Sequence, residues 1–132
     1  MSINFSGKWT ADLSASKILA HQPAAMTITI EHKDPELREE IVVLRADGQG
    51  QRSVFLCRTD SREGHCSFDG QVVRGGARWE GSGLVIEIWA EVGGRELHLC
   101  DCWSLSPDEQ TLYMEHRNDD LAGQRTVLNR EH

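Results

Sequence analysis

The chain has 132 residues, of which 39% are hydrophobic and 27% are charged, and its formal net charge is −7. These values are typical of one folded domain, here spanning residues 1–132, and they exclude a disordered chain. The excess of negative charge repels phosphate groups, so neither nucleic acid nor an anionic membrane is an expected partner. The first residues carry no basic and apolar leader, which predicts a cytoplasmic location.

Hydrophobic and polar residues alternate with a period of two along most of the chain, and this pattern predicts β-strands. Residues 14–24 are the exception and predict a short helix, which begins in the run Ser14–Ala20 and ends before Pro23. Turn sequences rich in Gly, Asp and Pro separate the other segments at spacings typical of an antiparallel meander. In chain order, the predicted strands are 9–13, 26–31, 37–46, 52–59, 70–79, 84–91, 97–103, 111–116 and 123–130.

Strands that each have one apolar face must bury that face together. A closed barrel does so and also removes exposed strand edges. We therefore predict an all-β protein with a single antiparallel up-and-down β-barrel of about 8 to 10 strands, capped at one end by the short N-terminal helix. A two-sheet sandwich is the alternative. A barrel of this size is able to hold one small ligand.

The first predicted strand carries Gly7 and Trp9, and this Gly-x-Trp resembles the opening motif of lipocalins and fatty-acid-binding proteins, together called calycins. The resemblance implies that Trp9 closes one end of the barrel beneath a late arginine, either Arg125 or Arg130. The chain is also similar to a family of uncharacterised bacterial lipocalin-like proteins, which implies the same fold. The segments that carry this similarity are 5–9, 30–35, 79–81 and 101–106.

If the apolar residues define the interior, several ionisable residues share the interior face. Asp101 alternates with Trp103, His116 with Met114, and His32 follows the run that begins at Met26. A buried Asp needs a cationic or hydrogen-bonding partner, so Asp101 is expected to pair with Arg125 or His116, to tie down the backbone, or to be protonated.

We predict that the cavity binds a small, largely apolar ligand without a cofactor. Arg125 also resembles the arginine that holds the carboxylate in fatty-acid-binding proteins, and its charge favours an anionic or carbonyl group on that ligand. The predicted ligand-binding residues are Trp103, Arg125, Asp101, His116, Met114, Met26 and Ile88.

Two other functions are open. The same cavity is suited to a cofactor-free isomerase or cyclase, in which Asp101, His116 or His32 acts as general acid or base. Alternatively the barrel is packed solid, and its outer surface around Trp89 binds a protein partner. That surface also predicts a possible homodimer.

The cysteines predict no metal site. His98, Cys100 and Cys102 project from one face of a strand, but the first and last of them lie about 13 Å apart, which is too far for one zinc ion. Cys57 and Cys66 are plausible neighbours on adjacent strands. Reduced thiols are expected in the cytoplasm, and a disulfide between these two is the alternative.

Overall fold

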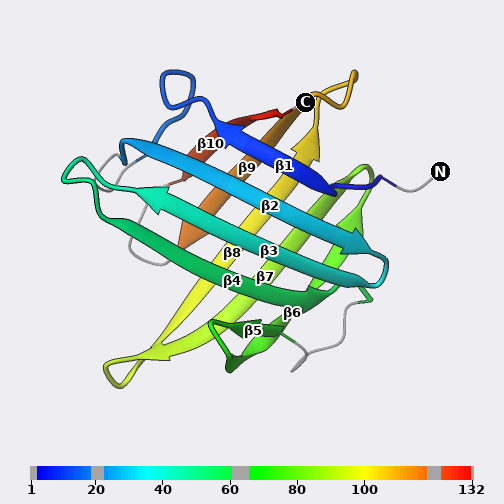
Figure 1. Ribbon diagram of the computed structural model, residues 1–132. Coiled ribbons are helices and arrows are strands. Elements are labelled where there is room, and N and C mark those ends of the chain that lie inside the picture. The colour runs from blue at the N-terminus through cyan, green and yellow to red at the C-terminus, as the bar shows by residue number, and fades with distance from the viewer. Residues whose placement is uncertain (1–2, 19–22, 61–65, 119–122, 132) are drawn as a thin grey trace.

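A computed structural model describes residues 3–18, 23–60, 66–118 and 123–131, and in these residues the chain forms a closed antiparallel barrel. Each strand pairs with its neighbour in the chain, and β1 pairs with β10 to close the barrel (Figure 1). The predicted antiparallel barrel is confirmed. The strands are β1 (Gly7–Ala11), β2 (Ala25–Lys33), β3 (Glu36–Leu44), β4 (Gly50–Arg58), β5 (Cys66–Phe68), β6 (Gln71–Glu80), β7 (Gly83–Val92), β8 (Arg95–Leu105), β9 (Thr111–Asn118) and β10 (Gln124–Arg130).

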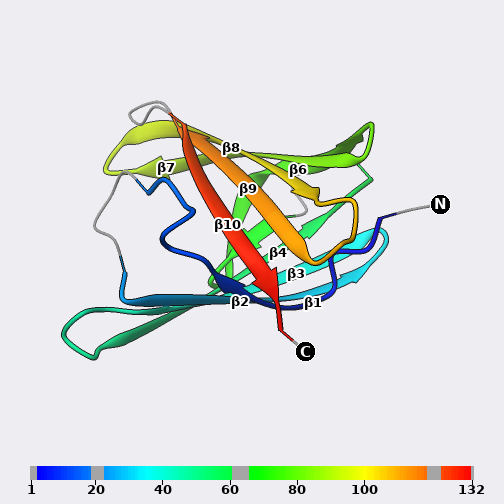
Figure 2. The same cartoon turned by 90° about the horizontal axis from the view of Figure 1, so that it is seen from above.

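The barrel is flattened into two facing layers. Figure 2 shows β1 to β3 on one side and β6 to β8 on the other, with β9 and β10 running between them. Alternate side chains of each strand point into the space between the layers, as period-two alternation requires. The largest fully buried side chains are Trp9, Trp103, Phe5, Ile30, Leu84, Leu112, Leu128 and Cys66.

The predicted helix over residues 14–24 is wrong, because no residue of this segment that the structure describes is helical. The carboxylate of Asp12 accepts hydrogen bonds from the Ser14 hydroxyl at 2.7 Å and from the Ala15 amide at 3.2 Å, and these bonds form a turn. Short polar side chains compete with helical hydrogen bonds in this way. Residues 19–22 lie outside the described part of the chain.

Hydrogen bonds to β10 also prevent this segment from forming a helix. The backbone amide of Lys17 donates to the Arg125 carbonyl at 2.7 Å, and the Arg125 amide donates back to the Lys17 carbonyl at 2.9 Å. The Ser16 hydroxyl accepts the Val127 amide at 2.9 Å. The segment therefore runs as an irregular extension along the edge of β10.

An aromatic cluster fills the interior next to the N-terminal segment. The Phe5 ring stacks on Trp79 and on His32 with centroids 5.8 Å away in each case, and it meets the edge of Trp103 at 5.7 Å. The Phe5 carbonyl accepts the indole N–H of Trp9 at 3.0 Å. Phe5 is therefore at the centre of these contacts. We call Phe5, Trp9, His32, Trp79 and Trp103 the Phe5 cluster.

The late arginine above Trp9 is Arg130. Its guanidinium lies 4.3 Å from the centre of the Trp9 ring, a cation–π contact. Arg125, the first choice from the sequence, is exposed on the outer face, because Thr126 and Leu128 are the inward residues of β10. The expectation that Arg125 faces the interior is therefore wrong.

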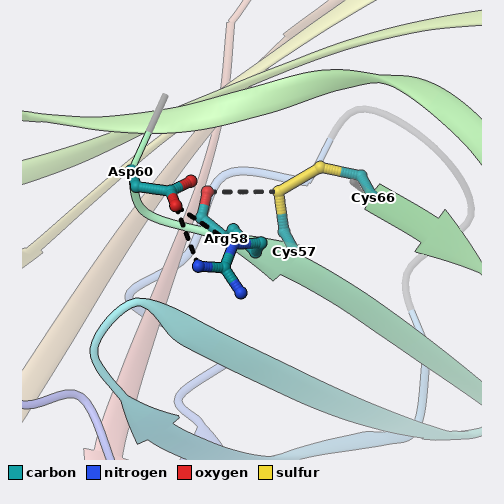
Figure 3. Close-up of a disulfide and its surroundings, with 4 residues drawn as sticks. All are labelled: Cys57, Arg58, Asp60 and Cys66. Atoms are coloured by element: carbon teal, nitrogen blue, oxygen red, sulfur yellow. Dashed lines mark hydrogen bonds and ion pairs between the residues drawn. A yellow bond between two sulfur atoms is a disulfide. The ribbon is translucent and has the colours of Figure 1, made fainter. Parts of the chain in front are cut away.

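A disulfide joins Cys57, near the end of β4, to Cys66, the first residue of β5, with their Cα atoms 4.2 Å apart (Figure 3). The expectation of reduced thiols is wrong for this pair. Cys100 and Cys102 are free cysteines. The disulfide anchors the short strand β5 to β4 next to the pair formed by Phe55 and Phe68.

Candidate functional site

The interior contains a cavity of about 210 Å³. It lies between β3, β4 and β5 on one side and β7, β8 and β9 on the other. This cavity counts against a barrel packed solid with side chains, one of the alternatives open from the sequence. The residues that line the cavity are Glu39, Ile41, Phe55, Phe68, Ile86, Ile88, Leu99, Asp101 and His116.

Asp101 and His116 form a pair on the wall of this cavity. They are register partners on the neighbouring strands β8 and β9, so their side chains emerge side by side. A short hydrogen bond joins Nδ1 of His116 to the Asp101 carboxylate. This bond raises the pKa of His116 against the opposing effect of burial. The side chains are 32% and 30% exposed, so solvent reaches the pair.

Glu39 is the third ionisable residue of the cavity. It lies in β3 between the inward residues Leu37 and Ile41 and is only 5% exposed. No other side chain that the structure describes hydrogen-bonds its carboxyl group. Burial raises the pKa of Glu39, and the nearby charge of Asp101 raises it further, to about 8. Glu39 is therefore mostly protonated at neutral pH and is a hydrogen-bond donor.

Glu39 was not among the residues predicted from the sequence, although it alternates with Leu37, Ile41 and Val43 on one face of the strand. This alternation was obscured because the uninterrupted run Ile41–Leu44 is apolar on both faces of the strand. The outward members of this run, Val42 and Leu44, are indeed exposed.

Among the residues predicted to bind a ligand, Asp101, His116 and Ile88 line the cavity. Trp103 and Met114 are buried in the core without lining it. Met26 packs against the same core and is half-buried.

The remaining predicted residues lie elsewhere. His32 belongs to the Phe5 cluster, where its Nδ1 accepts the Phe5 amide at 3.2 Å and its Nε2 lies 2.6 Å from the Asp34 carboxylate. Both ring nitrogens are thus engaged away from the cavity. Arg125 places its guanidinium over the Tyr113 ring on the outside of the barrel, 4.7 Å from the ring centre.

The outer face of β7 and β8 carries the histidine and free cysteines considered as metal ligands. Glu87 is hydrogen-bonded there to His98 at 3.0 Å and to Arg78 at 2.6 Å. In the part of the chain that the structure describes, no three His, Cys, Asp or Glu side chains gather as a metal site. Trp89 lies on the same outer face, covered by Arg74 at 4.8 Å and by the His98 ring at 4.9 Å.

A second hollow of about 460 Å³ lies between β2, β3 and the end of β4. Its two arginines pair with carboxylates, Arg38 with Glu40 at 3.2 Å and Arg58 with Asp60 at 2.9 Å. It is larger than the interior cavity, but it contains no buried ionisable group without a partner among the described residues. We therefore regard the interior cavity as the functional site.

Comparison with known proteins identifies the fold. The chain is similar in structure to apo lipid-binding protein 8 of Caenorhabditis elegans, with a TM-score of 0.64 at 8% identity over 96% of this chain and 95% of the other. Secretory abundant heat soluble protein 4 of Ramazzottius varieornatus gives a TM-score of 0.62 at 11% identity over 97% and 95%. A fatty acid transporter, REP1-NXSQ, gives 0.59 at 11% identity over 96% of each chain.

These likenesses support a calycin-like fold. The similarity is one of structure and not of sequence. No protein-family model and no curated protein matches the chain. Within the described residues, no helix is long and apolar enough to cross a membrane.

Proposed function

We propose that the protein binds a small, largely apolar molecule in the interior cavity. The observation that carries this proposal is a cavity with mostly apolar walls and a few ionisable groups, the usual composition of a small-molecule site. A volume of about 210 Å³ is below the roughly 300–1,000 Å³ of sites for drug-sized ligands, so the ligand is small. The barrels of similar structure include proteins described as lipid-binding and fatty-acid-transporting, which agrees with this class of ligand.

The polar end of the ligand is expected to lie at Glu39, Asp101 and His116. The sequence argument for an anionic ligand depended on Arg125, which lies on the outer face. Among the described residues, no Lys or Arg lines the cavity. The prediction of an anionic ligand therefore has no support. The polar end of the ligand is expected to interact with the carboxyl groups of Glu39 and Asp101 and with His116.

Binding of octan-1-ol tests the proposal. We expect Leu99→Trp to weaken binding at least about tenfold, because the larger side chain fills the cavity that Leu99 lines. Isothermal titration calorimetry measures both affinities. The control is Val72→Trp, which adds the same ring at an exposed site outside the cavity and is expected to leave binding unchanged. Equal affinities for wild type and Leu99→Trp contradict binding in this cavity.

A second candidate is proton transfer in the same cavity. Protonated Glu39 is able to donate a hydrogen bond to a carbonyl oxygen while the Asp101 carboxylate accepts a proton from the neighbouring carbon, which yields an enolate held by that hydrogen bond. We expect the wild type to exchange the α-protons of octan-2-one for deuterium, and Asp101→Asn to lower that rate about 100-fold or more. Nuclear magnetic resonance follows the exchange in D₂O. A wild-type rate equal to that of buffer eliminates this candidate.

Two other expectations from the sequence stay predictions. The Cys57–Cys66 disulfide counts against a cytoplasmic location, because disulfides persist mainly in oxidising compartments.

The prediction of a homodimer through the Trp89 face loses support, because Arg74 and His98 cover the ring of Trp89. Light scattering coupled to size exclusion measures the oligomeric state, and a monomer at all concentrations removes the dimer.

A further inference from the structure

Carboxyl groups outnumber basic groups in the lining of the cavity. Glu39 and Asp101 supply two carboxyl groups, whereas His116 is the one basic side chain among the described lining residues. His116 is already hydrogen-bonded to Asp101. Glu39 is therefore a carboxyl group that is 5% exposed, lines a cavity and has no partner among the described side chains. The Glu39 carboxyl is therefore available to bind a ligand in the cavity.

The two carboxyl groups belong to opposite walls. Glu39 lies on β3, and Asp101 lies on β8 in the facing layer of the barrel (Figure 2). The strand neighbours of Glu39 are apolar, since Ile30 of β2 and Phe55 of β4 are its register partners. Across the cavity, Asp101 and His116 are the titratable residues of the described lining. A small ligand in this space lies between the carboxyl of Glu39 and the Asp101–His116 pair.

We propose that the natural ligand of this cavity is a small apolar amine whose ammonium group pairs with Glu39. This inference rests on the proposed binding function and names its ligand class. An ammonium group supplies a positive charge that stabilises Glu39 as a carboxylate, and up to three hydrogen-bond donors to carboxylate oxygens. A fatty-acid anion instead meets two carboxyl groups and a single imidazole that is already hydrogen-bonded to Asp101. A neutral ligand brings no positive charge to either carboxyl group.

Binding of an ammonium group has a measurable signature. With a pKa of about 8, Glu39 is mostly protonated at pH 7 in the empty protein. An alkylamine, like the Lys side chain, is protonated at that pH. Its positive charge beside Glu39 favours the carboxylate, so Glu39 loses its proton to solvent. We therefore expect close to one proton released for each amine bound.

Three probes with the same eight-carbon chain separate the possibilities: octylamine, octan-1-ol and octanoic acid. We expect the wild type at pH 7 to bind octylamine about tenfold or more tightly than octan-1-ol, and octanoate most weakly. Calorimetric titrations in two buffers of different ionisation enthalpy give the number of protons released. We expect about one proton for octylamine and none for octan-1-ol.

Glu39→Gln tests the residue itself. It keeps the shape of the side chain and removes the charge, so we expect octylamine to bind about tenfold or more weakly while the affinity for octan-1-ol stays within about threefold. Glu40→Gln is the matched control, because Glu40 is the next residue of β3 and pairs outside the barrel with Arg52 at 2.9 Å. This variant is expected to bind all three probes like the wild type.

The outcomes distinguish this inference from the function on which it rests. Octan-1-ol bound as tightly as octylamine without proton release overturns the amine assignment and leaves apolar binding intact. Tightest binding of octanoate overturns it as well. Failure of all three probes overturns both proposals. The proton count of the wild type decides the question even if Glu39→Gln does not fold.

Discussion

Glu39→Gln is expected to raise the free energy of unfolding at about pH 9 and to change it little at about pH 5. In the folded protein the pKa of Glu39 is raised from 4.5 to about 8, first by burial and then by the charge of Asp101. Between these two values the folded state holds a proton that the unfolded state releases. The wild type therefore loses stability as pH rises through this window, by on the order of 3 to 5 kcal/mol. Glutamine has no proton to lose, so the variant lacks this decline.

Urea unfolding at about pH 5, 7 and 9 measures the effect for both proteins. Glu40→Gln serves as the control, because Glu40 faces outward and its pKa is lowered, above all by its hydrogen bond to Arg52. Glu40 is thus ionised throughout this pH range. Replacing it therefore leaves the decline of the unfolding free energy with rising pH unchanged. Parallel curves for wild type and Glu39→Gln contradict a protonated Glu39 in the interior.

The barrel was predictable because its signal repeats in every strand. Apolar residues alternate with polar ones, and short turns join the strands, so neighbouring strands pair in order. The segments 97–103 and 111–116 alternate without interruption, and there the pattern also gives the correct facing. Asp101 and His116 were placed on the interior side for this reason, and both lie there.

The errors occurred where the pattern is ambiguous or where single hydrogen bonds decide the structure. The run Ile41–Leu44 is apolar on both faces, so the pattern did not identify Glu39 as an interior residue. In β10 Arg125 shares a face with the apolar Val127, which led to the prediction that it faces inward, but the inward residues are Thr126 and Leu128. The helix prediction failed because the side chain of Asp12 forms a turn that residue propensities do not include.

The candidate site is formed by residues that are far apart in the sequence. Glu39 lies in the third strand, and its pKa depends on Asp101 in the eighth. Only closure of the barrel brings these residues to one cavity. The sequence shows two acidic residues in separate strands, and the fold makes them one site.

Phe5→Ala is expected to destabilise the protein by about 3 to 5 kcal/mol, as for other buried aromatic side chains. Phe5 is 0% exposed, and its ring contacts His32, Trp79 and Trp103. Its backbone bonds to Trp9 and His32 are available to alanine as well. The loss therefore measures the ring and the cavity that its removal leaves. Equilibrium unfolding in urea, followed by tryptophan fluorescence, gives the free energy.

Phe68→Ala is the matched control for this experiment. Phe68 is 44% exposed at the cavity, so it buries less surface, and its loss is expected to cost less than about 1.5 kcal/mol. No residue of the Phe5 cluster lines the cavity among the described residues. If Phe5→Ala and Phe68→Ala lower stability equally, Phe5 is not the central packing residue of its cluster. A large loss at Phe5 alone shows that the barrel depends on a side chain from before its first strand.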